Sequence, residues 1–542
     1  MTTPVKTITV TNFGGGLTRR NDGDINSGLT KFATSWGYDP YSKPGNLTWL
    51  NQPVSILTLS GQNGPIIAMK QRTEGPTSFD TFVYALANNE NLYRISVIQD
   101  SGVDNPNFDS PSLIGTLIDT VWTQGAGMAF YGSTEKIFFG SDSLVQRVNF
   151  DGSAATSIIA SGGSSSYVGA APRPLATFLG RLYFGNGANI GEIDSTELMV
   201  TATKLSPSLP SGMYVRDLDV TPDGNYLQIT ATRGQSEQDP RGTVAPGLSL
   251  SESYKFYWNG IDAGVTSSEH YPGMRLTANQ VVGNNNHAFG YDQNGLGVLS
   301  GQQKILTLPR NLAPFNGATF STSNMLGFAT AEYEESASRY RGAIYNYGQY
   351  DSEVQPGLYR LLRHNGATQD HVLTVPACVN VSNLVYSYPF VPTISSIGSV
   401  AKMYFSTAEG SVVSSTNYTQ ILWRLPTVPT AIGSIVAGVY ETQTQLFSKK
   451  VQVKELRLYT EPLVADNDFT IDLIGSGGSV MANGSQNFTA GTNVTIGNDM
   501  VRWNPGIIPT YALGVRITNA SVTGTRNWTA TKLEVDISDG GT

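Results

Sequence analysis

Four aspartates are the residues whose type and position in this chain could support acid–base chemistry. They lie near the first strands of repeated strand–turn units, at Asp217, Asp219, Asp223 and Asp292. A glycosidase needs two carboxyl groups that face each other across a cleft, and these four could converge in one. Asp223, however, stands in a Thr-Pro-Asp-Gly-Asn turn, where an aspartate ordinarily braces its own backbone. We therefore interpret Asp223 as a turn residue, and the pattern as a weak one for catalysis.

The patterns for metal binding are incomplete. Asp22, Asp24 and Asn26 alternate as in a calcium loop, but Ser27 and Ala33 stand where such a loop has Gly and Glu. No zinc-type pairing links the four histidines, which are His270, His287, His364 and His371.

Nucleophilic and phosphate-binding motifs are absent from the sequence. The single cysteine, Cys378, is expected to be a small core residue, and there is no nucleophile elbow or phosphate-binding loop. The repeated Ser-x-Asp boxes of sialidases are also missing. The sequence thus predicts no catalytic, cofactor-binding or metal-binding residues, no cofactor and no enzyme activity.

The composition limits the partners that the chain can have. Charged residues make up 14% of its 542 residues, below the roughly 25% usual for soluble domains, and the net charge is −8. A nucleic-acid grip needs clustered Lys and Arg, so this balance argues against one. No basic segment followed by an apolar one opens the chain, and no apolar run approaches the roughly 18 residues of a membrane span. We expect no signal peptide and no membrane span.

A strand–turn–strand unit recurs along most of the chain. In its clearest copy, residues 82–95, two runs rich in aromatic and β-branched residues flank an Asn-Asn-Glu-Asn turn. Successive copies are 55, 45, 45, 62, 54 and 60 residues apart when aligned on Tyr84, Phe139, Phe184, Ile229, Tyr291, Tyr345 and Phe405. Repeats of about fifty residues built from strands and turns are typical of propeller blades. The spacing therefore predicts a β-propeller of about seven blades.

The aromatic residues of the repeat are expected to fill the core between blades. They could instead form a stacking platform for sugars or bases, but their recurrence at one strand position favours packing. The arginines that follow aromatic residues fall on the opposite face of their strands, at Arg94, Arg360 and Arg424. A polar stretch, residues 234–247, separates two strands of one blade, and such insertions commonly carry contacts.

Both ends of the chain depart from the repeat. A strand-like run at residues 8–13 leads into a polar, turn-rich stretch, which could complete the first or last blade, and residues 44–59 are expected to start the first blade. After residue 447 at least four alternating strands follow in about 95 residues, as in a β-sandwich. A phase slip at Lys454-Glu455 fits a β-bulge. We therefore expect an all-β chain divided into an N-terminal segment (1–44), a propeller (45–445) and a sandwich (446–542).

Four short segments carry a family resemblance. They are the Phe-Gly-Gly-Gly-Leu opening at residues 13–17, Gly45-Asn46-Leu47, the aromatic strand at residues 254–260 and the basic, alternating strand at residues 449–462. In these segments the chain resembles bacteriophage tail β-propeller proteins, above all the tail-nozzle (tail tubular protein B-like) proteins of short-tailed phages. The chain is short for that family, whose members often carry extra domains.

The resemblance implies a virion structural protein located in the phage tail. Copies would form a ring, a hexamer, that lines or closes the DNA exit channel and contacts neighbouring tail proteins such as the adaptor and fibres. Genomic DNA would pass without specific binding, which the net charge of −8 fits. Two alternatives are a carbohydrate-binding or glycan-cleaving propeller for host recognition, and a cellular propeller scaffold.

Overall fold

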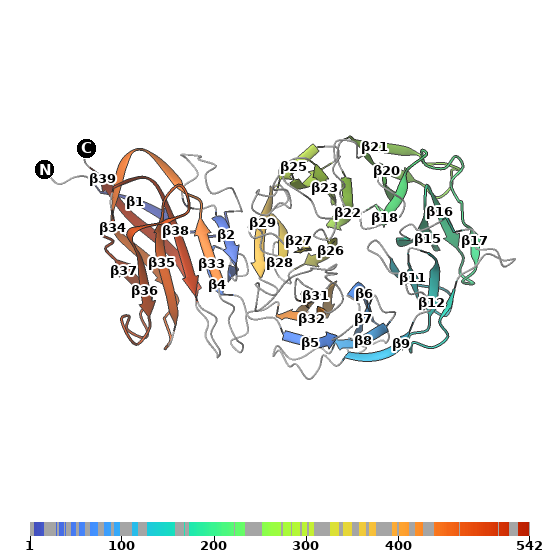
Figure 1. Cartoon of the computed structure of the whole chain (residues 1–542), viewed down its shortest axis with the longest axis horizontal. Helices are drawn as coiled ribbons and strands as arrows, with labels where there is room; N and C mark the ends of the chain where they lie inside the picture. The colour runs from blue at the N-terminus through green and yellow to red at the C-terminus, as the bar shows by residue number, and fades with distance from the viewer. Residues whose placement is uncertain are drawn as a thin grey trace.

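The chain is all-β in the computed structural model, with no α-helix among the residues described (Figure 1). The structure describes residues 5–15, 29, 32–36, 38–39, 45–49, 54–59, 66–73, 81–87, 91–97, 111–116, 127–141, 143–157, 167–168, 173–221, 223–233, 252–272, the strands between 275 and 426, and residues 438–465, 467–507, 509–519 and 529–540. Between residues 275 and 426 it describes strand backbones and the side chains of Tyr404 and Leu422. A search of these residues for a helix long and apolar enough to cross a membrane finds none.

Within these residues the strands of the repeat form seven separate four-stranded antiparallel sheets. The first two sheets contain, in order, β6 (Ile66–Thr73), β7 (Thr81–Ala87), β8 (Asn91–Val97) and β9 (Pro111–Thr116), then β10 (Met128–Tyr131), β11 (Lys136–Gly140), β12 (Val145–Val148) and β13 (Thr156–Ser157). The third and fourth contain β14 (Leu175–Phe178), β15 (Arg181–Asn186), β16 (Asn189–Ile193) and β17 (Met199–Thr201), then β18 (Tyr214–Val220), β19 (Leu227–Arg233), β20 (Glu252–Trp258) and β21 (Ser267–Pro272).

The fifth and sixth sheets contain β22 (Arg275–Val282), β23 (Asn285–Asp292), β24 (Gly295–Ser300) and β25 (Gln303–Thr307), then β26 (Leu326–Glu334), β27 (Tyr340–Gly348), β28 (Gly357–His364) and β29 (Thr368–Val375). The seventh joins β30 (Thr393–Ile397), β31 (Val400–Gly410) and β32 (Tyr418–Pro426) to β5 (Val54–Leu59), which comes from the other end of the chain.

The sheets form a ring of β-propeller type (Figure 1). The innermost strands touch in a closed cycle, β6, β10, β14, β18, β22, β26, β30 and back to β6. Because β5 pairs with β32 as the outermost strand of the seventh sheet, residues 54–59 close the ring. The expectation that residues 44–59 start the first blade was wrong, because the three strands of the last repeat leave an edge that this segment completes.

Aromatic and aliphatic side chains fill the spaces between neighbouring sheets. Tyr84 and Phe139 lie in one buried cluster between the first and second sheets, and Phe184 lies in the next, between the second and third. All three are fully buried, which confirms the predicted orientation for these positions. The side chains of Tyr345 and Phe405 lie outside those described.

The two ends of the chain form a second body, here called the terminal unit. It is an eleven-stranded assembly of β1 (Val5–Val10), β2 (Phe32–Trp36), β3 (Tyr38–Asp39), β4 (Leu47–Trp49), β33 (Gly438–Thr442), β34 (Gln445–Thr460), β35 (Asp468–Ile474), β36 (Val480–Thr489), β37 (Met500–Trp503), β38 (Thr510–Asn519) and β39 (Thr529–Asp539). One buried cluster joins residues of both ends, from Ile8 and Val10 to Val535 and Ile537. Its strands β2 and β3 lie beside β29 of the ring (Figure 1).

The pairing of β1 with β39 places the N-terminal strand outside the ring. Val5 pairs with Ser538 and Val10 with Leu533, while β4 pairs with the start of β39. The expected division at residues 44 and 445 stays a prediction, but the pairing places β4 and β33 in the terminal unit, and the ring sheets run from Val54 to Pro426. The predicted bulge is confirmed, because the register of β34 against β39 shifts between Val453 and Glu455.

Candidate functional site

The structure separates the four candidate aspartates. Asp217 and Asp219 lie on β18, the innermost strand of the fourth sheet, whereas Asp292 ends β23 of the fifth sheet. Asp223 lies in the exposed turn after β18, where its carboxylate accepts hydrogen bonds from the Thr221 hydroxyl at 2.6 Å and the Asn225 backbone N–H at 3.2 Å. Asp223 therefore braces its own turn, as its sequence context predicted, and these bonds hold the pKa of its carboxyl below the usual value.

Asp217 and Asp219 belong to a polar face of the fourth sheet. Strict alternation sends Leu227, Ile229 and Ala231 of β19 towards the apolar cluster shared with the third sheet. The residues between them, Gln228, Thr230 and Thr232, point to the other face and are buried. Cross-strand pairing continues this face, here called the polar seam, through Asp217, Thr230, Lys255 and Glu269 in one row.

Lys255 is the central charge of the polar seam. Its side chain is 3% exposed, and its ammonium lies 5.9 Å from the centre of the Tyr271 ring. Burial lowers the pKa of Lys255 to about 8, and the neighbouring carboxylates oppose that shift, in the order Glu269, Asp219 and Asp217. The polar seam thus places one buried cation in the electrostatic field of three carboxylates.

Glu269 is held by two tyrosine hydroxyls. Tyr271 donates a hydrogen bond to its carboxylate at 2.6 Å, and Tyr257 donates another at 3.2 Å. Burial, reinforced by the charge of Glu269, raises the pKa of both phenols, so they remain protonated donors at neutral pH.

The spacing of Asp217 and Asp219 is compatible with acid–base chemistry, but their surroundings are not. Residues two apart on a strand have Cα atoms about 6.6 Å apart, within reach of the roughly 6.5–9.5 Å carboxyl separation of inverting glycosidases. Both aspartates, however, share the charge of Lys255, and β22 of the fifth sheet lies against β18, β19 and β20. We interpret the polar seam as a packed joint between the fourth and fifth sheets.

The purified protein is accordingly expected to release no sugar from bacterial envelope polysaccharide. The variant that combines Asp219→Asn with Asp292→Asn should behave as the parent in a reducing-sugar assay, because we expect neither carboxylate to act as an acid or a base. Sugar release that the double variant abolishes would make the glycan-cleaving propeller the correct interpretation.

The described residues hold no metal-binding constellation. No group of three or more His, Cys, Asp or Glu side chains among them is placed to hold an ion. His270 stacks on Tyr254 with ring centres 4.4 Å apart, which is a packing role. Cys378, the calcium-like residues Asp22, Asp24, Asn26 and Ser27, the insertion 234–247 and the side chains of His287, His364, His371, Arg360 and Arg424 lie outside those described, whereas Ala33 is buried on β2.

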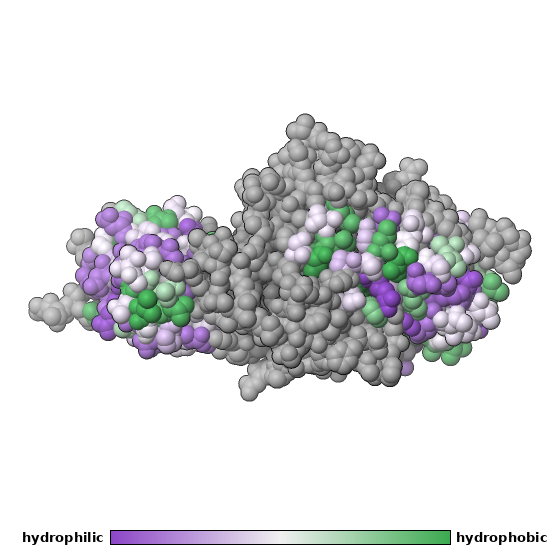
Figure 2. Space-filling view, turned by 90° about the horizontal axis from the view of Figure 1, so that it is seen from below, coloured by the Kyte–Doolittle hydropathy of each residue, from purple (hydrophilic) through white to green (hydrophobic). Residues whose placement is uncertain are grey.

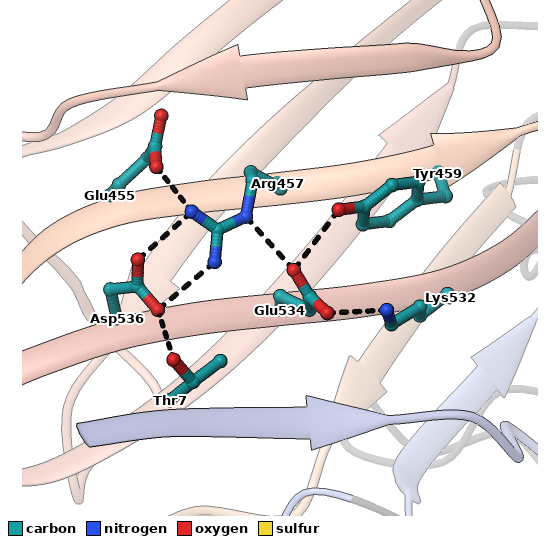
Figure 3. Close-up of polar contacts among 7 residues, drawn as sticks. All are labelled: Thr7, Glu455, Arg457, Tyr459, Lys532, Glu534 and Asp536. Carbon is teal, nitrogen blue, oxygen red and sulfur yellow. Dashed lines mark hydrogen bonds and ion pairs between the residues drawn. The ribbon is translucent and has the colours of Figure 1, made fainter.

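Sequence reasoning missed an ionic network on the terminal unit (Figure 3). Arg457 of β34 binds Asp536 of β39 through two parallel hydrogen bonds of 2.9 and 3.0 Å, and its Nε donates to Glu534 at 2.9 Å. Glu455 also contacts the guanidinium, Lys532 pairs with Glu534, and Thr7 of β1 donates to Asp536 at 2.6 Å. The network therefore ties β1 to the long strands β34 and β39. The polar residues that alternate with the apolar ones along β34 and β39 were the available signal in the sequence.

The comparisons with known proteins are of the fold. No family model matches the chain, and no curated protein matches it. Among solved structures, the chain is similar to BBS1N in complex with ARL6DN, with 9% identity, a TM-score of 0.40, and coverage of 70% of this chain and 98% of that one. It is also similar to a chain of the mitotic checkpoint complex (11% identity, TM-score 0.38, coverage 69% and 95%) and to the β-propeller domain of Myceliophteria thermophila Cps50 (Swd1) (8%, 0.37, 68% and 99%). With TM-scores this low, these similarities carry no argument about what the chain does.

Proposed function

We propose that the protein is a structural component of a bacteriophage tail, whose copies form a nozzle-like ring, a hexamer, around the DNA exit channel. The observation that carries this proposal is the meeting of three of the segments on which the phage-tail resemblance rests. The opening at residues 13–17, the segment Gly45-Asn46-Leu47 and the long strand β34 are far apart in the chain. Phe13 of the opening, Leu47 of the second segment and apolar residues of β34 belong to one core in the terminal unit.

The contacts at this meeting point are specific. The Phe13 backbone N–H donates to the Gly45 carbonyl at 3.2 Å, and the Tyr440 hydroxyl donates to the Phe13 carbonyl at 2.9 Å. The rings of Phe13 and Tyr440 also pack edge to face, 5.7 Å apart, beside Leu47. Segments that pack in one core depend on one another for folding, so they are expected to occur together in one family. Their contact therefore supports the resemblance over a chance match of short motifs.

The proposal also assigns the two bodies. The ring is a seven-bladed propeller, each four-stranded sheet being one blade, with β5 closing the last blade from the N-terminal side. The terminal unit is a β-sandwich, in which β34 passes from one layer to the other where its pairing with β38 shifts register between Leu446 and Val451. Such a molecule offers two bodies joined where β2 and β3 lie beside β29, which suits an assembly subunit.

Electron microscopy of the purified full-length protein, together with native mass spectrometry, tests the assembly. We expect closed rings with a central hole and a mass of six chains. The hole should admit duplex DNA without holding it, because the low charge density leaves few cations to bind phosphates. Monomers at every concentration, or tight and salt-sensitive DNA binding by the isolated chain, would contradict the proposal.

A further inference from the structure

Turns on one side of the third and fourth sheets expose apolar side chains beside carboxylates. Leu179, Leu198 and Ile261 are 62%, 52% and 85% exposed. Each lies in a turn that follows the first or third strand of its sheet, so these turns share one side of the ring. Gly260 brings two of these turns together, since a Cβ atom there would lie 2.5 Å from Leu179 Cδ1.

Three aspartates lie in the turns of the same side, at Asp194, Asp223 and Asp262. Their carboxylates accept hydrogen bonds from neighbouring Thr and Asn side chains, and in the described part of the chain none of them forms an ion pair. These bonds keep the pKa values of Asp194 and Asp223 below the usual range, so both are charged at neutral pH. We call this combination of three leucine or isoleucine side chains and three aspartates the acidic patch.

A complementary surface lies on the terminal unit, next to the two chain ends. Lys449 and Lys450 of β34 are exposed, and the Lys450 ammonium lies 5.7 Å from the ring centre of Tyr511, itself 55% exposed. Val5 and Lys6, the exposed first residues of β1, lie nearby. Val5 pairs with Ser538 of β39, and two residues further along the chain the Gly540 backbone N–H donates a hydrogen bond to the Lys450 carbonyl. We call these five residues the basic patch.

The two patches lie on different bodies of the molecule, the basic patch on the terminal unit and the acidic patch on the ring. Figure 1 shows the chain ends at the far left of the terminal unit and the third sheet at the far right of the ring. Figure 2 shows that hydrophobic residues on the described surface form small separate patches among hydrophilic ones, on both bodies. Because isolated apolar side chains are ordinary on a protein surface, it is the opposite charge of the two patches that favours a contact between them.

We infer that the basic patch of one copy docks on the acidic patch of the next copy. Lysines face aspartates in this contact, and Val5 and Tyr511 cover exposed leucine and isoleucine side chains. Because the patches are different surfaces on different bodies, the contact is head-to-tail, and such contacts generate rings when the rotation closes and open filaments when it does not. The inference rests on the proposed ring and names the surfaces that build it.

Charge reversal tests the contact in the full-length protein. One variant combines Lys449→Glu with Lys450→Glu, and the other combines Asp223→Lys with Asp262→Lys. Each alone places like charges at every contact, so we expect the dissociation constant measured by native mass spectrometry or ultracentrifugation to rise by about 100-fold or more. An equimolar mixture places opposite charges at every contact again, so rings of alternating copies should reform.

Matched controls change the same charges elsewhere. Arg502→Glu and Asp499→Lys alter exposed residues of the terminal unit outside the basic patch, and should leave the rings intact. Unchanged melting temperatures in all variants show that folding is not the cause. Rings that survive both reversals, or single variants that the mixture does not rescue, would overturn this contact and leave the proposed ring standing. A parent protein that never assembles would overturn both.

Discussion

Replacing Phe184 by Ala is expected to lower the free energy of unfolding by about 3–5 kcal/mol. The ring of Phe184 is fully buried between the second and third sheets and packs with Leu182, Phe138 and Val145. It also lies over its cross-strand partner Gly191, where a Cβ atom would come within 2.0 Å of the ring. Truncation therefore leaves a cavity that neither a neighbouring side chain nor the glycine can fill.

Denaturant unfolding of the variant and the parent at the same concentration measures this effect. Val200→Ala is the matched control, because Val200 lies on β17 of the same sheet and is 53% exposed, and its cost should stay within about 0.5 kcal/mol. If the two substitutions cost the same, the predicted orientation of the repeat is wrong at this position.

Arg173→Met is expected to cost about 3–5 kcal/mol, because it removes several hydrogen bonds that a buried guanidinium donates to buried acceptors. Arg173 is fully buried between the second and third sheets. It donates to the Asn186 side chain at 2.9 Å, the Val168 carbonyl at 2.8 Å and the Ser143 carbonyl at 3.2 Å. The guanidinium also lies over Tyr167, at 4.7 Å from the ring centre.

Arg173→Lys should recover little of this loss, because one ammonium cannot reach all the separate acceptors that the two Nη atoms of the planar guanidinium reach. Arg181→Met provides the control, since Arg181 is 44% exposed and its contact with Glu192 is 3.7 Å long, so its loss should cost less than about 1 kcal/mol. Thermal and denaturant unfolding of the three variants give the comparison. An Arg173→Met protein as stable as Arg181→Met would contradict the conclusion that Arg173 holds the second and third sheets together.

Local patterns predicted the parts of the fold that local pairing builds. The aromatic positions Tyr84, Phe139 and Phe184 were correctly assigned, because each recurs in a hairpin whose strands are neighbours in sequence. The strands with which β1 and β5 pair could not be predicted from the sequence. Val10 pairs with Leu533 and Leu59 with Gln420, and no periodicity within either segment identifies an edge hundreds of residues away.

The same limit applies to the candidate site. The alternation of β19 already separates Gln228, Thr230 and Thr232 from their apolar neighbours, so a polar face could have been inferred from sequence. The covering of that face by β22, which places Asp217 and Asp219 in a packed joint, depends on the closure of the ring. Residue spacing alone therefore left the aspartates as candidates for catalysis.

The most direct test of the phage-tail assignment is immunogold electron microscopy of purified phage particles, with antibodies raised against this chain. We predict gold at the tail tip in intact particles, and a ring of six copies at that position in averaged images. Particles that contain no copy of the chain, or that carry it anywhere other than the tail, would contradict the account.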